Sequence, residues 1–386
     1  MLRRHRRFWA VLLWAMLVTP LAVMLLAPAT ATVDRREMRA LAKWPTWPDG
    51  RKGWKHLPRQ IDQYLADQFG LREHMLLAQA LVAQRLLRNG NDAVLVGQDG
   101  WLFYRVSNTL QQSAGILVRE QHVAMTADTL AQMARALEAR GSRFLVAVPP
   151  SSSTIHDAHL PAWARRHGRR TEYDLLLEAL AARGVEAIDL RPALQTAARE
   201  EQVYHRHDTH WNKLGALVAF NELVAATGRP DWRLDPSAML VAATRQGGDL
   251  ARMLGIDAVV TEPAPALRNP QPDRDVPDTE RQAPVQLNTA QAGPSILVVG
   301  DSFTRIYFPP MVLTHTGRYA WTHHEGCGLD WRWVERVAPD EVWWMPTERI
   351  LLCKPGVAPA GLHPPVAAAL TPSAAPPAPA RPPSRT

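Results

Sequence analysis

The chain has 386 residues, 46% of them hydrophobic, and a formal net charge of +7. This hydrophobic content is enough for a large buried core, which excludes a chain that is disordered throughout. Four arginines lie in residues 1–31, which contain no aspartate, glutamate or lysine, so the remaining residues carry only +3. Without a cluster of basic residues on one face, this charge argues against binding to nucleic acid.

The N-terminal segment combines basic residues with an apolar run. Four arginines within the first seven residues precede an uncharged stretch from residue 8 to residue 31. Basic residues ahead of an apolar span hold that end in the cytoplasm and send the rest of the chain across the membrane. The run exceeds the roughly 7–15 residues of a signal-peptide core and is long enough to cross a bilayer, which favours a retained anchor. A cleaved signal peptide stays open, because residues 29–31, Ala-Thr-Ala, have the pattern of a cleavage site.

We expect one folded domain, residues 60–353, between two segments of different composition. Residues 32–59 are charged and rich in proline and tryptophan, which is typical of an irregular connector near a membrane. Residues 354–386 are rich in proline and alanine and poor in side chains that can pack, which predicts a disordered tail.

Patterns typical of helices and strands follow one another within this domain. Helical spacing of apolar residues is seen over residues 61–87, with a break near Gly70, and residues 94–104 predict a strand-turn-strand unit. Helices are then expected over 127–141, 171–184 and 214–228, and buried strands over 142–150 and 185–190. The alternation is typical of an α/β fold in which helices flank a parallel sheet. The hydroxyl residues 151–154 follow one strand, where they either line the mouth of the sheet or cap a turn.

The most informative stretch is residues 294–307, which read PSILVVGDSFTRIY. Its apolar run before Gly300 predicts a buried strand, so Ser302 falls at the strand's C-terminal end, where open α/β sheets bind their ligands. A serine hydroxyl is a good nucleophile only if a base lies within hydrogen-bond reach and a third group orients that base. Asp208 and His210 can supply both, because side chains two residues apart in an extended segment point to one side. The sequence therefore predicts a triad with Ser302 as nucleophile, His210 as general base and Asp208 as the group that orients His210.

Some of these segments also allow other interpretations. Residues 204–210 contain three histidines and one aspartate, as some metal sites do, but the chain has neither the His-Glu-x-x-His spacing nor paired Cys-x-x-Cys motifs. The sequence thus favours the triad, with no metal and no organic cofactor. Residues 247–250, Gly-Gly-Asp-Leu, are a candidate for backbone N–H groups that approach an oxyanion. Arg305 and Tyr307 follow Ser302 by about one helical turn, and either reach the site or lie on a surface helix.

The motifs together resemble the alginate O-acetyltransferase family of the AlgJ and AlgX type. The order of two motifs carries the resemblance, because Asp-Thr-His-Trp at residues 208–211 comes before Gly-Asp-Ser-Phe at residues 300–303. Matching residues elsewhere, which extend the resemblance over about residues 62–349, are Tyr64, Asp67, Phe69, Gly70, Arg72, the segment 97–104, Pro339, Asp340, Val342, Glu348 and Arg349.

The resemblance implies an SGNH-hydrolase-like fold with permuted motif order. It implies an exported O-acetyltransferase that moves an acetyl group through an acetyl-serine onto hydroxyls of a polysaccharide, alginate or a similar exopolysaccharide. The ligands would be an acetyl donor and the polysaccharide acceptor, and a membrane protein would pass acetyl groups across. The location would be the periplasm, with residues 8–31 as the anchor in the bacterial inner membrane.

Two alternatives stay open beside the transferase. With water in place of the sugar hydroxyl, the same triad would make a carbohydrate acetyl esterase, and the fold could also serve a non-catalytic assembly protein of a polysaccharide secretion complex. The only two cysteines, Cys327 and Cys353, can pair in an exported, oxidising compartment, but the sequence does not show whether their geometry allows it.

Overall fold

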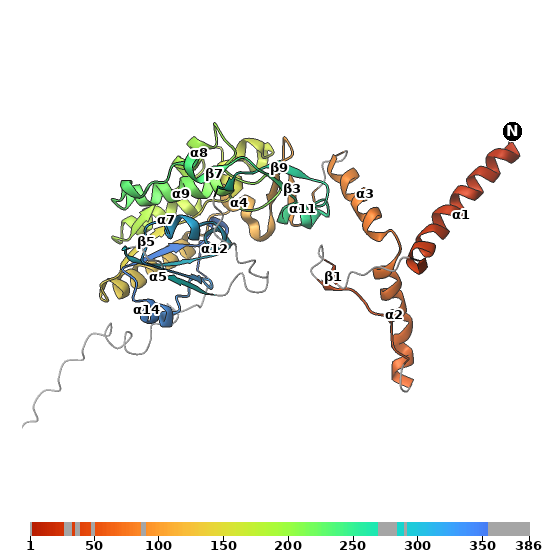
Figure 1. The fold of residues 1–386 in the computed structure, drawn as a ribbon, viewed down its shortest axis with the longest axis horizontal. Helices are drawn as coiled ribbons and strands as arrows, with labels where there is room; N and C mark the ends of the chain where they lie inside the picture. The colour runs from red at the N-terminus through yellow and green to blue at the C-terminus, as the bar shows by residue number, and fades with distance from the viewer. Residues whose placement is uncertain are drawn as a thin grey trace, which may run out of the picture.

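The computed structural model describes residues 2–26, 33–34, 39–47, 51–85, 90–268, 284–288 and 292–353. The predicted tail, residues 354–386, and the possible cleavage site at residues 29–31 lie outside the described residues. Figure 1 shows helices α1 (Leu2–Leu26), α2 (Arg51–Gln68) and α3 (Arg72–Arg85) extending away from a large α/β domain.

Helix α1 contains the apolar run that the sequence singled out. Its span His5–Met24 has a mean hydropathy of 1.7 and is long enough to cross a membrane. A signal sequence has the same length and composition, so the helix fits a retained anchor and a cleaved segment equally well.

Helix α2 begins earlier than the sequence analysis expected. Residues 32–59 were predicted to be an irregular connector, but the chain is helical from Arg51 onward. The reason is that Trp54 and Leu57 extend the helical spacing of Ile61 and Tyr64 backward by two turns. The predicted break near Gly70 is present, since α2 ends at Gln68 and α3 starts at Arg72.

A six-stranded sheet forms the centre of the domain, in the order β11-β13-β12-β14-β5-β6. Five neighbouring strands are parallel, which confirms the predicted α/β class, and the edge strand β11 alone is antiparallel. The antiparallel edge was not predicted, because β11 is short and follows a polar, proline-rich segment. The strand bounds are β5 (Arg143–Ala147), β6 (Glu186–Ile188), β11 (Val285–Asn288), β12 (Ser295–Gly300), β13 (Arg318–His323) and β14 (Glu341–Met345).

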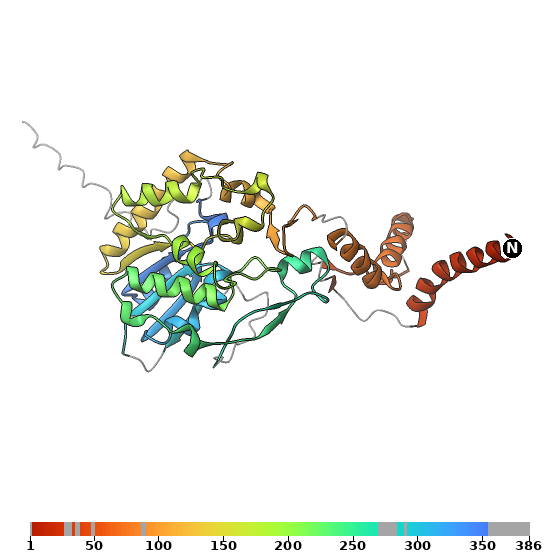
Figure 2. The same cartoon turned by 90° about the horizontal axis from the view of Figure 1, so that it is seen from above.

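Helices cover both faces of this sheet, as predicted. In β12, Ile296 and Val298 pack with one group of helices, whereas Leu297 and Val299 pack with the other, because successive strand residues point to opposite faces. The first group is α8 (Arg191–Ala197), α9 (Lys213–Ala226), α12 (Ser302–Tyr307) and α13 (Pro309–Val312), and the second is α5 (Glu120–Glu138), α7 (Glu172–Ala181) and α14 (Trp331–Val337). Figure 2 shows the strands between the yellow helices α5 and α7 and the green helix α9.

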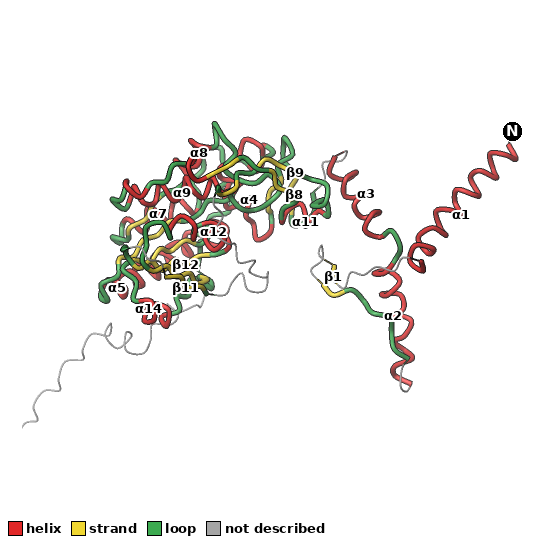
Figure 3. The backbone as a smooth tube through the Cα atoms, viewed as in Figure 1, coloured by secondary structure: helices red, strands yellow, loops and turns green. Residues whose placement is uncertain are grey.

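Smaller elements surround the central layers (Figure 3). The predicted strand-turn-strand unit is present as the antiparallel pair β3 and β4, and two further antiparallel pairs, β7 with β10 and β8 with β9, form from residues that the sequence left unassigned. The bounds are β1 (Val33–Asp34), β2 (Arg39–Ala40), β3 (Val94–Val96), β4 (Leu102–Tyr104), α4 (Thr109–Ser113), α6 (Ser152–Ile155), α10 (Pro236–Met239), β7 (Leu240–Val241), β8 (Thr244–Gln246), α11 (Asp249–Leu254), β9 (Thr261–Pro263) and β10 (Ala266–Leu267).

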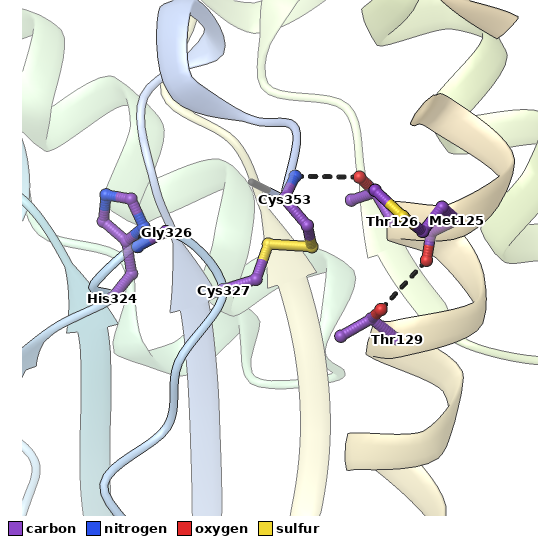
Figure 4. Close-up of a disulfide and its surroundings, with 7 residues drawn as sticks. All are labelled: Met125, Thr126, Thr129, His324, Gly326, Cys327 and Cys353. Atoms are coloured by element: carbon purple, nitrogen blue, oxygen red, sulfur yellow. Dashed lines mark hydrogen bonds between the residues drawn. A yellow bond between two sulfur atoms is a disulfide. The ribbon is translucent and has the colours of Figure 1, made fainter. Parts of the chain in front are cut away.

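A disulfide ties the C-terminal end of the domain to the sheet. It joins Cys327, in the loop after β13, to Cys353, which follows β14, and both residues are buried. The backbone N–H of Cys353 also donates to the hydroxyl of Thr126 on α5 at 2.9 Å (Figure 4). Of the two states that the sequence left open, the structure therefore has the paired one.

Replacing both cysteines with alanine is expected to lower the free energy of unfolding by about 3 kcal/mol, because the crosslink restricts the unfolded chain between residues 26 positions apart. Urea denaturation of the purified protein in detergent measures this change. A reducing agent should cause the same loss in the wild type and none in the double variant. Equal unfolding midpoints for the wild type and the double variant without reducing agent would contradict the prediction.

Candidate active site

The site begins at the turn between β12 and α12, where Ser302 is the first helical residue. Gly300 closes the strand, and a Cβ at this position would lie 2.3 Å from Oγ1 of Thr304 and 3.0 Å from the carbonyl oxygen of Met345. A larger residue would thus clash with the first turn of α12 and with β14. Glycine at this position allows the tight strand-to-helix turn that presents Ser302 at the edge of the sheet.

Asp301 fixes this turn to the end of β14. Its Oδ1 accepts the backbone N–H of Phe303 at 3.0 Å, and its Oδ2 accepts the backbone N–H of Thr347 at 2.9 Å and the Thr347 hydroxyl. The carboxylate is buried. Its oxygens accept hydrogen bonds from residues that follow two neighbouring strands, β12 and β14. Sequence reasoning did not predict this role, because nothing in the Gly-Asp-Ser motif indicates a partner 46 residues downstream.

The loop that carries His210 is held against the same turn. Tyr204 and Trp211 form an antiparallel bridge, and Asn212 caps helix α9 by accepting the N–H of Gly215 at 3.0 Å. The indole Nε1 of Trp211 then donates to the carbonyl oxygen of Phe303 at 3.2 Å. Trp211, which follows His210, and Phe303, which follows Ser302, are therefore hydrogen-bonded to each other.

The structure brings the three predicted triad residues together. Nε2 of His210 lies 2.7 Å from Oγ of Ser302, and Nδ1 of His210 lies 2.6 Å from Oδ1 of Asp208. An ionised carboxylate only accepts hydrogen bonds, so the proton of the imidazole belongs on Nδ1. Nε2 is then the acceptor for the Ser302 hydroxyl, which is the arrangement in which an imidazole can take the serine proton.

Asp208 is buried, and all its hydrogen bonds favour the ionised form. Oδ1 accepts the side-chain and backbone N–H groups of His210, at 2.6 and 3.1 Å. Oδ2 accepts hydrogen bonds from Nη2 of Arg245 at 2.7 Å and from the backbone N–H of Asp249 at 3.1 Å. Burial alone would raise the pKa of this carboxyl, but the charge and hydrogen bond of His210 and the charge of Arg245 outweigh burial and hold its pKa well below the usual value.

The glycine loop at residues 247–250, the candidate for N–H groups that approach an oxyanion, directs the N–H of Asp249 at Asp208. Gly248 has φ +147°, and a Cβ there would lie 2.1 Å from the carbonyl oxygen of His207. This close packing brings the N–H of Asp249 to Asp208. The Asp249 carboxylate in turn accepts the N–H and hydroxyl of Thr209, at 2.7 and 2.5 Å, while burial and the nearby Asp208 raise its pKa.

A cation does not fit this cluster of residues. The side chains of Asp208, His210 and Asp249 are close enough to share an ion. However, Oδ2 of Asp208 already pairs with the Arg245 guanidinium, and Nδ1 of His210 faces Asp208 as a donor. A second positive charge would be repelled by Arg245 and would have to displace these bonds.

Other residues singled out in the sequence lie near the triad in different ways. His205 and His207 face the buried carboxylate of Glu262, with Nδ1 to Oε1 distances of 3.6 and 4.0 Å. Tyr307 is buried with its ring 6.1 Å from that of His210, whereas the Arg305 guanidinium lies over Trp321 at 5.6 Å. Of the hydroxyl residues after β5, Ser151, Ser152 and Ser153 line a small recess together with Thr209, whereas the Thr154 hydroxyl donates to Glu348 at 2.6 Å.

Comparison with known proteins gives a family match over this region. The sequence model of the family described as "SGNH hydrolase-like domain, acetyltransferase AlgX" matches residues 94–319, which is more than half of the chain and includes Asp208, His210 and Ser302. The solved structure of PatB1 from Bacillus cereus superposes with a TM-score of 0.51 at 13% identity, over 68% of this chain and 98% of that chain. This likeness confirms the fold that the sequence motifs implied.

Four curated relatives carry the name "Probable alginate O-acetylase AlgJ". The protein from Pseudomonas syringae pv. tomato is 25% identical over 211 residues, which are 54% of this chain and 53% of the relative. The protein from Pseudomonas putida is 27% identical over 225 residues, which are 57% of each chain. The chain therefore spans about half the length of the curated relatives it matches.

The lowered pKa of Asp208 predicts how stability depends on pH. Its stabilising contribution is complete above about pH 4, the pKa of aspartate in an unfolded chain, and is lost as the pH falls through the lower pKa of the folded state. We expect Asp208→Asn to lower the free energy of unfolding by about 3 kcal/mol at neutral pH, because it leaves Arg245 without its partner. The difference from the wild type should shrink below about pH 4.

Urea denaturation over a series of pH values measures the free energy of unfolding of the wild type and of Asp208→Asn. Asp92→Asn, at an exposed position, is the control and should follow the wild type throughout. A difference between Asp208→Asn and the wild type that stays constant as the pH falls would contradict the prediction.

Proposed function

Because the chain belongs to the AlgX family of SGNH hydrolase-like acetyltransferases, we propose that it is an exported O-acetyltransferase that modifies hydroxyls of a polysaccharide. The names of the AlgJ relatives point to alginate or a similar exopolysaccharide as the acceptor. The observation that carries the proposal is the 2.7 Å contact between His210 Nε2 and Ser302 Oγ, with Asp208 on the other ring nitrogen.

The proposed reaction has two halves with a covalent intermediate. In the first, Oγ of Ser302 attacks the carbonyl carbon of an acetyl donor while His210 Nε2 takes the serine proton. The bond between the acetyl group and the donor breaks, and His210 returns the proton to the leaving group. The product is an acetyl ester on Ser302.

In the second half, a sugar hydroxyl replaces the donor. Nε2 of His210 takes the proton of that hydroxyl as its oxygen attacks the acetyl-serine. The ester bond to Ser302 breaks, and the proton on His210 returns to Oγ. Asp208 keeps the imidazole oriented in both halves and balances the positive charge that His210 carries between proton transfers.

The same proposal covers location, partners and domain limits. Residues 60–353 would be the catalytic domain in the periplasm, held to the inner membrane by residues 8–31 and joined to that anchor by residues 32–59. Residues 354–386 would be an appended tail. A membrane protein would supply acetyl groups from the cytoplasmic side, since activated acetyl donors are made there, and the transferase would need no metal and no bound organic cofactor of its own.

The proposal predicts a Ser302-dependent acetyl-enzyme. Intact mass of the full-length protein in detergent, after incubation with an acetyl ester, should show one added acetyl group in the wild type and none in Ser302→Ala or His210→Ala. Ser237→Ala, at an exposed serine, is the matched control and should acetylate normally.

Added oligosaccharide separates the transferase from its alternatives. Transfer of the acetyl group from the protein to sugar supports the transferase, and release of acetate at a rate that sugar does not change identifies an esterase. Absence of any adduct and of turnover in the wild type would overturn the proposal in favour of a non-catalytic assembly protein.

Arg245 is predicted to be a positioning residue for this reaction, because it binds the oxygen of Asp208 that His210 does not use. Arg245→Gln should raise the pKa of Asp208, slow acetyl transfer about tenfold at neutral pH, and shift the acidic side of the pH-rate profile to higher pH. Arg252→Gln, a nearby exposed arginine that lies 3.9 Å from Asp257, is the control. A slower enzyme with an unshifted pH profile would assign Arg245 a structural role only.

A further inference from the structure

The start of helix α11 lies against the loop that carries Asp208 and His210. The backbone N–H of Asp249 donates to the Asp208 carboxylate at 3.1 Å. The side chain of Asp249 binds Thr209, the residue between the two triad members. Its Oδ1 accepts the backbone N–H of Thr209 at 2.7 Å, and its Oδ2 accepts the Thr209 hydroxyl at 2.5 Å. Asp249 therefore binds two consecutive residues of the loop, one as a donor and the other as an acceptor.

The Thr209 hydroxyl connects this carboxylate to the imidazole of His210. Oγ1 of Thr209 lies 3.4 Å from Nδ1 of His210, and Oδ2 of Asp249 lies 3.8 Å from the same nitrogen. Because the hydroxyl proton is directed at Asp249, a lone pair of Oγ1 is available to the N–H at Nδ1. The main acceptor of that N–H is Asp208 at 2.6 Å. The imidazole thus has a strong acceptor and a weaker one on the same ring nitrogen.

Gly248 allows α11 to come this close to the loop. Its φ is +147°, and a Cβ there would lie 2.1 Å from the carbonyl oxygen of His207 and 3.2 Å from Cβ of Asp208. Only glycine fits such an approach of two backbones. Thr209 is 6% exposed, so its hydroxyl is largely shielded from water. A hydrogen bond in such surroundings is stronger than one in solvent, which favours a fixed geometry for Thr209 and Asp249.

Ionisable side chains around the imidazole come from the loop itself and from several neighbouring segments. They are Asp208 on the loop, Lys213 on α9, Arg245 on β8, Asp249 on α11, Glu262 on β9, Tyr307 on α12 and Arg349 after β14. Arg245 pairs with Asp208 at 2.7 Å, and burial raises the pKa of Tyr307, which stays neutral. Asp249 is therefore a second negative charge beside Nδ1 of His210.

We propose that Thr209 and Asp249 are positioning residues that form a second arm on His210, beside Asp208, and stabilise the protonated imidazole through the Thr209 hydroxyl. The proton on Nδ1 stays on the ring, and none passes to Asp249. When Nε2 takes the Ser302 proton, the positive charge of the ring strengthens the hydrogen bonds to both acceptors. The inference rests on the proposed acyl-transfer function, and both residues act on it through His210.

Single-turnover acylation at a series of pH values tests the inference. Full-length protein in detergent is mixed with an acetyl ester, and intact mass of quenched samples gives the rate of acetyl-serine formation. Asp249→Asn should slow this rate about fivefold above neutral pH, because loss of the negative charge makes His210 a weaker base. The acidic limb of the pH-rate profile should also move to lower pH, by about half to one unit. This shift is opposite to the one expected for Arg245→Gln.

Variants of Thr209 show whether the two residues act as one arm. Thr209→Val removes the hydroxyl and should slow acylation about fivefold, whereas Thr209→Ser keeps the hydroxyl and should stay within about twofold of the wild type. Thr209→Val combined with Asp249→Asn should be no slower than Asp249→Asn alone, since either change breaks the same arm. Thr196→Val and Asp231→Asn, both at exposed positions, are the matched controls and should acylate as the wild type does.

Thermal unfolding shows whether each variant is folded, and the comparison of Thr209→Val with Thr209→Ser decides the question if Asp249→Asn does not fold. Three results would overturn the inference: a slower Asp249→Asn with an unshifted acidic limb, a double variant whose loss equals the product of the two single losses, or an unchanged rate in Thr209→Val. Each of these leaves the acetyl-enzyme in place. A wild type that forms no acetyl-serine would instead overturn the proposed function, and this inference with it.

Discussion

The candidate site depends on one buried carboxylate, that of Asp208. An ionised carboxylate inside a protein is costly unless its lone pairs are used, and here four donors use them. Only two of these donors come from its own loop, and the others come from Arg245 on β8 and from the backbone at the start of α11. The small β8–β9 pair is therefore part of the site, because the charge of its Arg245 acts together with His210 to keep Asp208 ionised.

Topology explains how residues so far apart in the chain meet. β5, β14 and β12 are adjacent and parallel, so their carboxyl ends lie side by side at one edge of the sheet. Ser151, Thr347 and Ser302 each follow one of these ends. Asp301 links two of the ends directly by accepting hydrogen bonds from Phe303 and Thr347. The nucleophile turn and the segment that follows β14 are thus tied to each other at one edge of the sheet.

Local pattern was sufficient to predict the alternating helices and strands, the strand before Gly300 and the pairing of Asp208 with His210, because each depends on residues close in sequence. It could not predict Arg245, whose strand of Thr-Arg-Gln has no alternation of apolar residues and whose partner is 37 positions away. The same holds for Thr347, which meets Asp301 only because β14 crosses over to lie beside β12. The early start of α2 was missed because the prolines and charged residues of this segment masked the helical spacing of Trp54 and Leu57. The antiparallel edge strand β11 was missed because it is short and follows a polar, proline-rich segment.

A serine, a histidine and an aspartate in hydrogen-bond contact do not by themselves distinguish a sugar hydroxyl from water, because the base treats either proton alike. Selectivity must therefore come from groups that hold the acceptor and are outside the proton path. Such groups are unpaired in the free protein, and the stability that they sacrifice is repaid only when the ligand binds. Asp208 and Asp301 are instead engaged within the protein, because His210 and Arg245 donate to the first and Phe303 and Thr347 to the second. The triad therefore does not by itself decide which acceptor takes the acyl group.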